Sequence, residues 1–252
     1  MRIPTPDPDG GGDEAVPRPG PRKEKMTDRE LSAWRRSRVK DLWRIFRIMS
    51  EFVEGFETFS ELGPCVSVIG SARTNPGHEY YEMAQALGRE LVERDFGVIT
   101  GGGPGIMEAA NKGAQEADGV SVGLGITVPH EKGANAFVDH DKLITFDFFF
   151  VRKVMFVKYA QGFVAFPGGF GTMDELFESL TLIQTGKSTR FPIVLMGKDF
   201  WDGMIGWLRE TMLEADNITE DDCDLFQVTD DPGEAVEMLE SFYEEHPISP
   251  NF

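Results

Sequence analysis

The chain has 252 residues, 40% of them hydrophobic, which is enough for one large domain or two small ones with a proper core. Its 25 Lys and Arg residues against 43 Asp and Glu residues give a net charge of −18, which argues against a nucleic-acid partner. No apolar run is long enough to span a membrane, and no signal-peptide core begins the chain, so we expect a cytoplasmic protein without membrane contact. The two cysteines are far apart, so we expect neither a disulfide nor a zinc site.

The first residues and the following helix form a separate region. Residues 1–26 are rich in proline, glycine and charge, and we expect them to be a disordered tail. Thr27 is followed by Glu30, the pattern of a helix-starting capping box, and apolar residues then recur at helical spacing, which predicts a helical extension over residues 27–62. Residues 18–47 hold eleven Lys or Arg against four acidic residues, so this segment either binds a nucleic acid or an acidic partner or is simply a solvated helix face. Because the basic residues surround the helix, we favour packing of its aromatic stripe on the body or on a second subunit.

From residue 63 onward short β-branched runs alternate with helical patterns, and we expect one domain over residues 63–252. Such alternation is typical of an α/β fold, a doubly wound, mainly parallel sheet with helices on both faces. The expected strands span residues 66–69, 98–100, 120–126, 142–146, 163–166, 193–196 and 225–228. The expected helices span residues 78–93, 148–160, 171–185, 200–214 and 232–244, and a further one begins at Pro104.

Three of these strands end in glycine-rich loops. In open parallel sheets, ligands bind beyond the carboxyl ends of the strands. Glycines there let backbone N–H groups approach an anion, and the helix that follows adds its positive N-terminal end. A phosphate site for a mononucleotide is therefore predicted, with tight turns as the plainer explanation of each single loop. The loops contain Gly70-Ser71, Gly101-Gly102-Gly103 and Pro167-Gly168-Gly169.

Other phosphate-binding motifs fit the sequence poorly. Ile106 stands where a dinucleotide-binding loop needs its third glycine, and the strand at 120–126 is not followed by the acidic residue that holds a ribose. Gly186-Lys187-Ser188 follows a helix, so we interpret it as a helix C-cap and not as a triphosphate-binding loop.

The most informative segment is PGGFGTMDE at residues 167–175. Thr172 can offer its hydroxyl to a phosphate oxygen, whereas Glu175 would be repelled by that phosphate and should face the sugar. The same residues also have capping-box form, in which Glu175 would only bind backbone N–H groups. Arg152 lies in the first turn of a helix that leaves the same sheet edge, and it either faces the pocket or extends to solvent with Lys153.

The motif PGG-x-GT-x-x-E, with an Arg-Lys pair in the helix before it, resembles the LONELY GUY family of cytokinin-activating phosphoribohydrolases, long mislabelled as lysine decarboxylases. The resemblance covers about residues 63–230, including GGGPGIMEAANKGA at 101–114. It implies a Rossmann-like sheet, a homodimer or larger homo-oligomer, and hydrolysis of AMP or an N6-substituted AMP to free base and ribose 5-phosphate. By motif match Arg152 and Glu175 take the catalytic positions, and neither a metal nor a cofactor is required. The expected substrate- and phosphate-binding residues are Gly70, Ser71, Gly101, Gly102, Gly103, Met107, Lys153, Gly168, Gly169, Gly171 and Thr172.

Two features distinguish this chain within the resemblance. Glu108 stands where many plant-like members have glycine, and the long N-terminal helix is extra, which together point to the longer bacterial branch. No segment resembles a pyridoxal-phosphate lysine site, so we reject the decarboxylase label. The alternative is a non-catalytic nucleotide or molybdopterin carrier or sensor, because similar PGG-x-GT folds serve that role and fold does not decide function. The pairing of Arg152 with Glu175 favours the enzyme.

Overall fold

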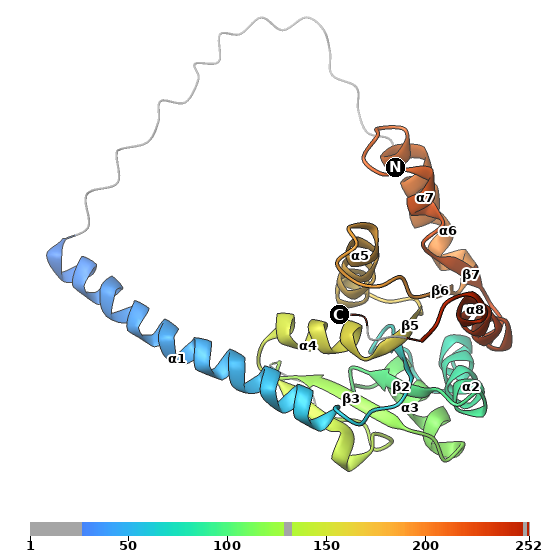
Figure 1. The fold of residues 1–252 in the computed structure, drawn as a ribbon, viewed down its shortest axis with the longest axis horizontal. Helices are drawn as coiled ribbons and strands as arrows, with labels where there is room; N and C mark the ends of the chain where they lie inside the picture. Colours follow the sequence, from blue (N-terminus) through green and yellow to red (C-terminus); the bar gives the residue numbers. More distant parts are fainter. Residues whose placement is uncertain (1–26, 129–132, 249–250, 252) are drawn as a thin grey trace, which may run out of the picture. The chain divides into compact units, whose positions relative to one another are not determined.

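The computed structural model describes residues 27–128, 133–248 and 251, so the tail predicted over residues 1–26 lies outside the described part. By its internal contacts the chain divides into two units, residues 1–45 and residues 46–252. In the first unit the structure describes the beginning of helix α1, which spans Asp28–Thr58 and starts where the sequence predicts. The second unit contains the whole sheet and the other helices (Figure 1).

The second unit is built on a seven-stranded sheet in the order β4-β3-β2-β1-β5-β6-β7. Every neighbouring pair of strands is parallel, which confirms the predicted α/β fold. All residues of β1, β2, β5 and β6 are buried, as expected for central strands that helices cover on both faces. The strands are β1 Cys65–Ile69, β2 Gly97–Thr100, β3 Ser121–Ile126, β4 Leu143–Phe146, β5 Ala160–Ala165, β6 Ile193–Met196 and β7 Gln227–Thr229.

Alternate side chains of the central strands β1, β2, β5 and β6 face two separate hydrophobic cores. Val66 and Val68 of β1 pack with α2, α3 and α8, whereas Cys65 and Ile69 pack with α4, α5 and Trp201 of α6. The remaining helices are α2 Glu79–Glu93, α3 Ile106–Glu116, α4 Phe149–Lys158, α5 Phe170–Gln184, α6 Lys198–Trp207, α7 Glu220–Cys223 and α8 Pro232–Glu245. A 3-10 turn at His140–Lys142 and a π-helix at Leu208–Leu213 complete the elements.

The predicted boundaries differ from the structure in a few places. The helix predicted over 200–214 is α-helical only to Trp207 and continues as the π-helix. Strand β5 begins at Ala160 instead of residue 163, because pairing with β1 extends the strand into a segment of low β propensity. Helix α3 starts at Ile106, since Gly105 has a φ of +74°, a conformation that an α-helix does not contain. Gly186 has a φ of +64° just after α5, which confirms the predicted C-cap.

The strand order places a topological switch point between β1 and β5. The chain runs from β1 through β2, β3 and β4 to one edge of the sheet, and then from β5 through β6 and β7 to the other. Ligands of open α/β sheets bind in the crevice at the carboxyl ends of the strands where the order reverses. Two of the three glycine-rich loops, those after β1 and β5, leave the sheet at this point, and the third leaves β2 beside them.

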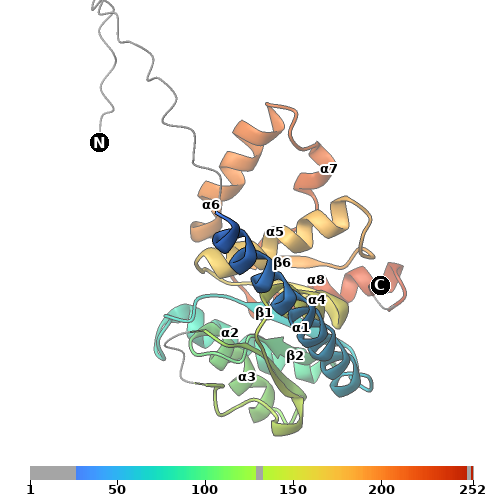
Figure 2. The ribbon, with the colours of Figure 1, turned by 90° about the vertical axis from the view of Figure 1, so that its left-hand side faces the viewer.

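Within the second unit, the last part of α1 holds the start of α4. The carboxylate of Glu51 accepts hydrogen bonds from the backbone N–H groups of Asp147 at 3.0 Å and Phe148 at 3.3 Å, and Arg47 forms an ion pair with Asp147. Phe148 is the N-cap residue of α4 and its apolar side chain cannot cap, and Glu51 instead anchors the backbone N–H groups of the two residues that precede the helix. Figures 1 and 2 both show this part of α1 beside α4.

No helix among the described residues combines the length and apolar character that a membrane crossing needs.

Replacing Glu51 tests this contact. We expect Glu51→Ala to lower the free energy of unfolding by about 1–2 kcal/mol, because two backbone N–H groups lose a charged acceptor. Glu54→Ala is the matched control, since Glu54 is an exposed glutamate on the same helix. Urea denaturation of the two variants measures the difference, and equal stabilities would show that the Glu51 contact contributes nothing.

Candidate active site

A cavity of about 960 Å³ opens at the switch point of the sheet. Its walls come from the loops after β1, β2 and β5 and from the first turns of α4 and α5. Most of the residues that the sequence singles out are brought together here. They are Gly70, Ser71, Gly101, Met107, Arg152, Gly168, Gly169, Gly171, Thr172 and Glu175.

Three expected binding residues are placed elsewhere. Gly102 and Gly103 lie behind the cavity wall, where their carbonyl oxygens accept hydrogen bonds from the Asn135 side chain at 3.1 and 3.0 Å. Lys153 forms ion pairs of 2.9 Å with Asp174 and Glu178 and lines a separate cavity of about 580 Å³ along α5. The Lys153 side chain is only 16% exposed, so it does not extend into solvent as one interpretation of the sequence expects.

Backbone hydrogen bonds join the three loops to one another. The N–H of Ser71 donates to the carbonyl of Pro167 at 3.0 Å, and the N–H of Ile106 donates to the carbonyl of Ser71 at 3.1 Å. At Gly105 a Cβ atom would lie 2.3 Å from the Ser71 carbonyl oxygen, so this approach of α3 to the first loop requires glycine. The floor of the cavity is therefore formed by main chain that the fold itself holds in place.

A buried polar network holds the loop after β2 from behind. The Thr100 hydroxyl donates to Asn111 Oδ1 at 2.6 Å and accepts from the Gly102 N–H at 2.9 Å. The Asn111 amide in turn donates to Ser121 Oγ at 2.9 Å, and the Asn135 amide donates to Asn111 Oδ1 at 3.0 Å. Such a satisfied network is rigid, because breaking any member leaves a buried polar group without a partner.

The start of α5 has the features of an anion cradle. The helix begins at Phe170 with Gly169 as its N-cap, so its first N–H groups receive no side-chain cap from that position. Thr172 is consequently in the first turn, and the interpretation of Thr172–Glu175 as a capping box is wrong. A Cβ at Gly168 would lie 2.1 Å from Thr172 Oγ1, whereas Gly169 and Gly171 face open space. Uncapped N–H groups, a hydroxyl and missing side chains suit a phosphate oxygen.

Arg152 and Glu175 meet inside this cavity. Arg152 Nη2 lies 3.6 Å from Glu175 Oε1, and the two side chains are 13% and 6% exposed. Glu175 Oε1 is buried and takes part in no hydrogen bond with the described residues. Burial raises the pKa of Glu175 to about 7, although the charges of Arg152 and Lys153 oppose the rise. Of the two interpretations that the sequence left open for Arg152, the structure supports the one in which it faces the pocket, where Glu175 Oε1 lies beside its guanidinium without a hydrogen bond to the described residues.

Arg152 is held by aromatic rings as well as by charge. Its guanidinium carbon lies 5.1 Å from the ring centre of Phe149 and 5.6 Å from that of Phe156. Both rings line the cavity, so they limit how far the guanidinium can move.

Sequence analysis missed one side of the cavity. His78 lies there as the N-cap of α2, and its Nδ1 accepts the Tyr80 N–H at 3.2 Å, which leaves Nε2 as the donor nitrogen of the neutral ring. The carboxyl-end rule applied to β3, β4 and β6, and not only to the glycine-rich strands, would have pointed to Ile126, Val128, Phe149 and Phe200. The other missed side chains follow the glycine-rich end of β1 or lie further along α4, and they are Arg73, Thr74, His78, Tyr80 and Phe156.

Comparison with known proteins gives three kinds of similarity. The family described as possible lysine decarboxylase matches residues 107–239. A cytokinin riboside 5′-monophosphate phosphoribohydrolase of Mycobacterium marinum is 31% identical over 143 residues, 56% of this chain and 74% of that protein. A pyrimidine/purine nucleotide 5′-monophosphate nucleosidase of Escherichia coli K12 is 35% identical over 127 residues, 46% of this chain and 28% of that protein. The structure of the molybdenum cofactor carrier protein of Chlamydomonas reinhardtii aligns with a TM-score of 0.51 over 72% of this chain and 99% of that one, and its 22% identity shows the fold alone.

The buried carboxyl couples stability to pH. The pKa of Glu175 is about 7 in the folded chain, above its ordinary value of 4.5, so folding takes up a proton between these values. Its stabilising contribution is therefore fully present below the lower value and is lost as the pH rises through the upper one. We expect Glu175→Gln to be more stable than the wild type by about 2–3 kcal/mol near about pH 8, and nearly equal to it near about pH 5. Urea denaturation at both pH values measures this, and a difference independent of pH would contradict the burial of the carboxylate.

Proposed function

This chain belongs to the LONELY GUY (LOG) family, the family described as possible lysine decarboxylase, and on that basis we propose that it hydrolyses the N-glycosidic bond of a nucleoside 5′-monophosphate. The products are a free base and ribose 5-phosphate. The names of the mycobacterial phosphoribohydrolase and the Escherichia coli nucleosidase support this activity. The observation that carries the proposal is the buried Arg152–Glu175 pair beside an uncapped, glycine-lined helix start.

The 5′-phosphate is assigned to the start of α5. Gly169 and Gly171 leave room for it, Gly168 admits the Thr172 side chain, and the Thr172 hydroxyl and the positive end of the helix attract it. Glu175 lies one turn further along α5, where the ribose follows the phosphate. The apolar part of the wall, which includes Ile126, Val128 and Phe149, suits a planar base because stacking needs no matched hydrogen bonds.

The reaction passes through an oxocarbenium-like ribose, as in glycoside hydrolysis. The Glu175 carboxylate stabilises the positive charge that grows at C1′ and accepts a proton from the attacking water. The water oxygen bonds to C1′ while the electrons of the N–C1′ bond leave with the base, which takes up a proton. A guanidinium hardly loses its proton, so Arg152 acts by its charge and hydrogen bonds on Glu175 and the ligand, and not as the acid.

The other two candidate activities explain the site less well. A pyridoxal-phosphate decarboxylase needs a lysine in its active site, and no lysine is among the described residues that line this cavity. A carrier of a phosphorylated ligand gains nothing from a desolvated carboxylate, which repels its anionic cargo. An enzyme that builds positive charge on a sugar needs that carboxylate.

The direct assay is incubation with AMP and with an N6-substituted AMP, followed by chromatography of the free base. We expect Glu175→Gln to keep AMP binding but to lose at least about a hundredfold in kcat, because the neutral amide neither stabilises the cation nor accepts the proton.

For the wild type, kcat/KM should fall as the pH drops below about 7, where Glu175 becomes protonated. Unchanged turnover in the variant would refute the role of Glu175, and retained AMP without base release by the wild type would favour a carrier.

Arg152 is tested through the same pH profile. Its positive charge lowers the pKa of Glu175, so Arg152→Ala should reduce kcat and move the acidic limb of the profile to higher pH. Arg152→Lys, which keeps the charge, should restore the position of the limb. A profile that stays in place in Arg152→Ala while the rate falls would show that Arg152 does not act on Glu175.

A further inference from the structure

The loop between β1 and α2 lies across the cavity from the start of α5. Helix α5 packs in one hydrophobic core and α2 packs in the other, so the two helices cover opposite faces of the sheet. Both begin beyond the carboxyl ends of neighbouring strands, so the residues that precede α2 and the start of α5 border the same crevice from its two sides. Arg73, Thr74 and His78 line the cavity here, and we call residues 73–78 the second wall.

Backbone contacts hold the second wall against the loop of the phosphate cradle. The Ser71 N–H donates to the Pro167 carbonyl at 3.0 Å, and Ser71 Oγ accepts the N–H of Arg73 at 3.1 Å. A Cβ at Gly105 would lie 3.0 Å from Ala72 Cα, so the start of α3 supports this loop from behind. Arg73 is therefore only two residues from a main-chain bond to the loop that leads into α5.

Both polar side chains of the second wall keep donors for an anion. Arg73 is exposed, and no ion pair joins its guanidinium to another of the described residues. His78 Nδ1 accepts the Tyr80 N–H at 3.2 Å, so Nε2 carries the proton of the neutral ring. The His78 and Tyr80 ring centres are 5.2 Å apart, which limits how the imidazole can turn. A guanidinium and an imidazole N–H are donors that suit phosphate oxygens.

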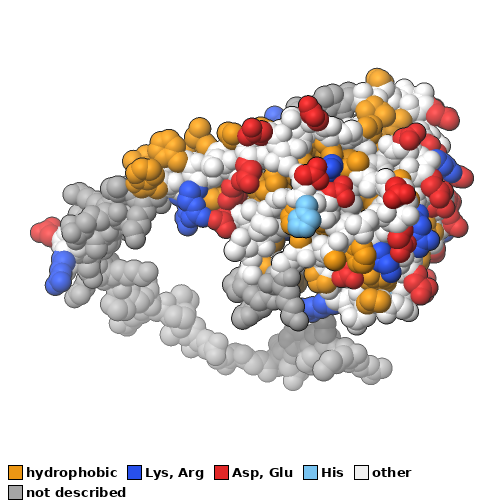
Figure 3. Space-filling view, turned by 90° about the horizontal axis from the view of Figure 1, so that it is seen from below, with side chains coloured by type: hydrophobic (Ala, Val, Ile, Leu, Met, Phe, Trp, Pro, Cys, Tyr) orange, Lys and Arg blue, Asp and Glu red, His pale blue; other side chains and the backbone are white. Residues whose placement is uncertain are grey.

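The lining of the cavity is basic although the chain is acidic. Acidic side chains are spread over the face of the second unit that Figure 3 shows, as the net charge of −18 implies. Among the described residues that line the cavity, Glu175 is the single acid, against two arginines and a histidine. Glu79, Asp199 and Asp230 lie near Tyr80, but none of them lines the cavity. The charge on this side therefore favours an anionic ligand group.

We propose that Arg73 and His78 bind the oxygens of the 5′-phosphate that point away from α5, and that they set the preference of the site for nucleotides over nucleosides. Arg152 lies beside Glu175, which leaves Arg73 as the other arginine of the lining. The start of α5 and the second wall then hold the phosphate from both sides with charge-assisted hydrogen bonds. This inference rests on the proposed function, from which it takes the position of the phosphate.

The first test is calorimetry with ribose 5-phosphate, a probe that has the phosphate but no base to release. We expect Arg73→Ala and His78→Asn each to weaken its binding by at least about tenfold, because each removes a donor to a charged acceptor. Asparagine at position 78 still caps α2, so this variant separates the imidazole from the helix cap. A wild type that does not bind the probe, or variants that bind it as tightly, would overturn the proposal.

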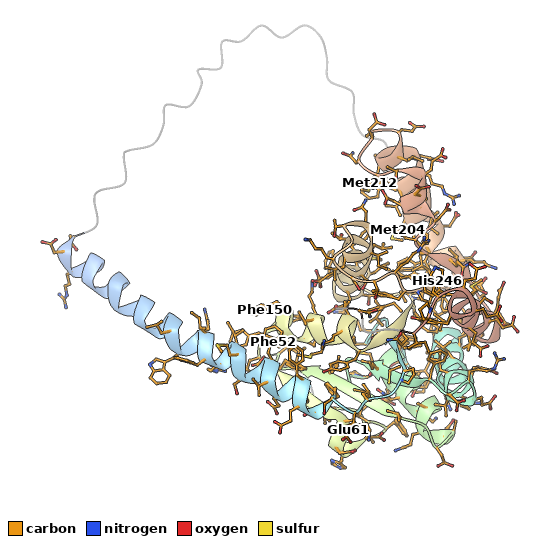
Figure 4. All side chains as sticks on the ribbon, in the orientation of Figure 1. Phe52, Glu61, Phe150, Met204, Met212 and His246 are labelled. Carbon is orange, nitrogen blue, oxygen red and sulfur yellow. The ribbon has the colours of Figure 1, made fainter. Side chains whose placement is uncertain are left out.

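Arg209→Ala and His246→Ala are the matched controls, and neither should change the affinity for ribose 5-phosphate. Arg209 is an exposed arginine of the π-helix, and His246, labelled in Figure 4, is an exposed histidine at the end of α8. Neither of them lines the cavity. An equal loss of affinity in the controls would show that binding follows the overall charge of the chain, which contradicts a role of the second wall.

The second test separates binding from chemistry. With AMP as substrate, we expect Arg73→Ala to raise KM by at least about tenfold and to leave kcat within about twofold. The inhibition constant of adenosine, which has no phosphate, should stay unchanged. A fall in kcat at constant KM, or an equal loss of affinity for adenosine, would contradict the proposal. A larger loss of affinity for ADP than for AMP would also contradict it, since the second wall would then hold a second phosphate.

Failure of this proposal is distinguishable from failure of the proposed hydrolysis. If the wild type releases no base from AMP but the variants lose ribose 5-phosphate, the second wall stands and the hydrolysis is refuted. If the wild type releases base and Arg73→Ala keeps its affinity for ribose 5-phosphate, the hydrolysis stands and the second wall is refuted.

Discussion

The candidate site depends on keeping the Glu175 carboxylate out of water without a hydrogen-bonded partner for one of its oxygens. An isolated buried carboxylate would be neutral, and the nearby charges of Arg152 and Lys153 offset part of that tendency, so the group titrates close to neutral pH. The ionised form of such a buried carboxyl is less stable than that of a solvated one, and a positive charge that develops on a ligand beside it is therefore strongly attracted. Residues that make a fold less stable in this way are concentrated at functional sites.

The sheet explains why the carboxylate lies beside an anion cradle. The switch point between β1 and β5 directs two glycine-rich loops to the same crevice, and backbone hydrogen bonds join them to each other and to the start of α3. The phosphate cradle and Glu175 both belong to α5, so their separation is set by the helix itself. Arg152 belongs to a different helix, α4, and reaches the same cavity from its first turn. Its position therefore depends on where the backbone at the start of α4 is held.

That dependence links the active site to α1. Glu51, on a helix distant in sequence, holds the two residues that precede α4. A contact that orders α1 therefore acts on Arg152 through main-chain hydrogen bonds and not through the ligand.

The sequence by itself determined the alternation of strands and helices, the parallel sheet, the three glycine loops and the pair Arg152 and Glu175, because each is written in local periodicity or in a short motif. It left open whether Thr172–Glu175 is a capping box, where Arg152 and Lys153 point, and which glycines face the ligand. Only the tertiary structure decided these, through a helix start at Phe170, ion pairs that turn Lys153 to Asp174 and Glu178, and a network that turns Gly102 and Gly103 away. The aromatic and basic side of the cavity was equally invisible, because Arg73, His78 and Phe200 belong to no short motif and meet only when the sheet is assembled.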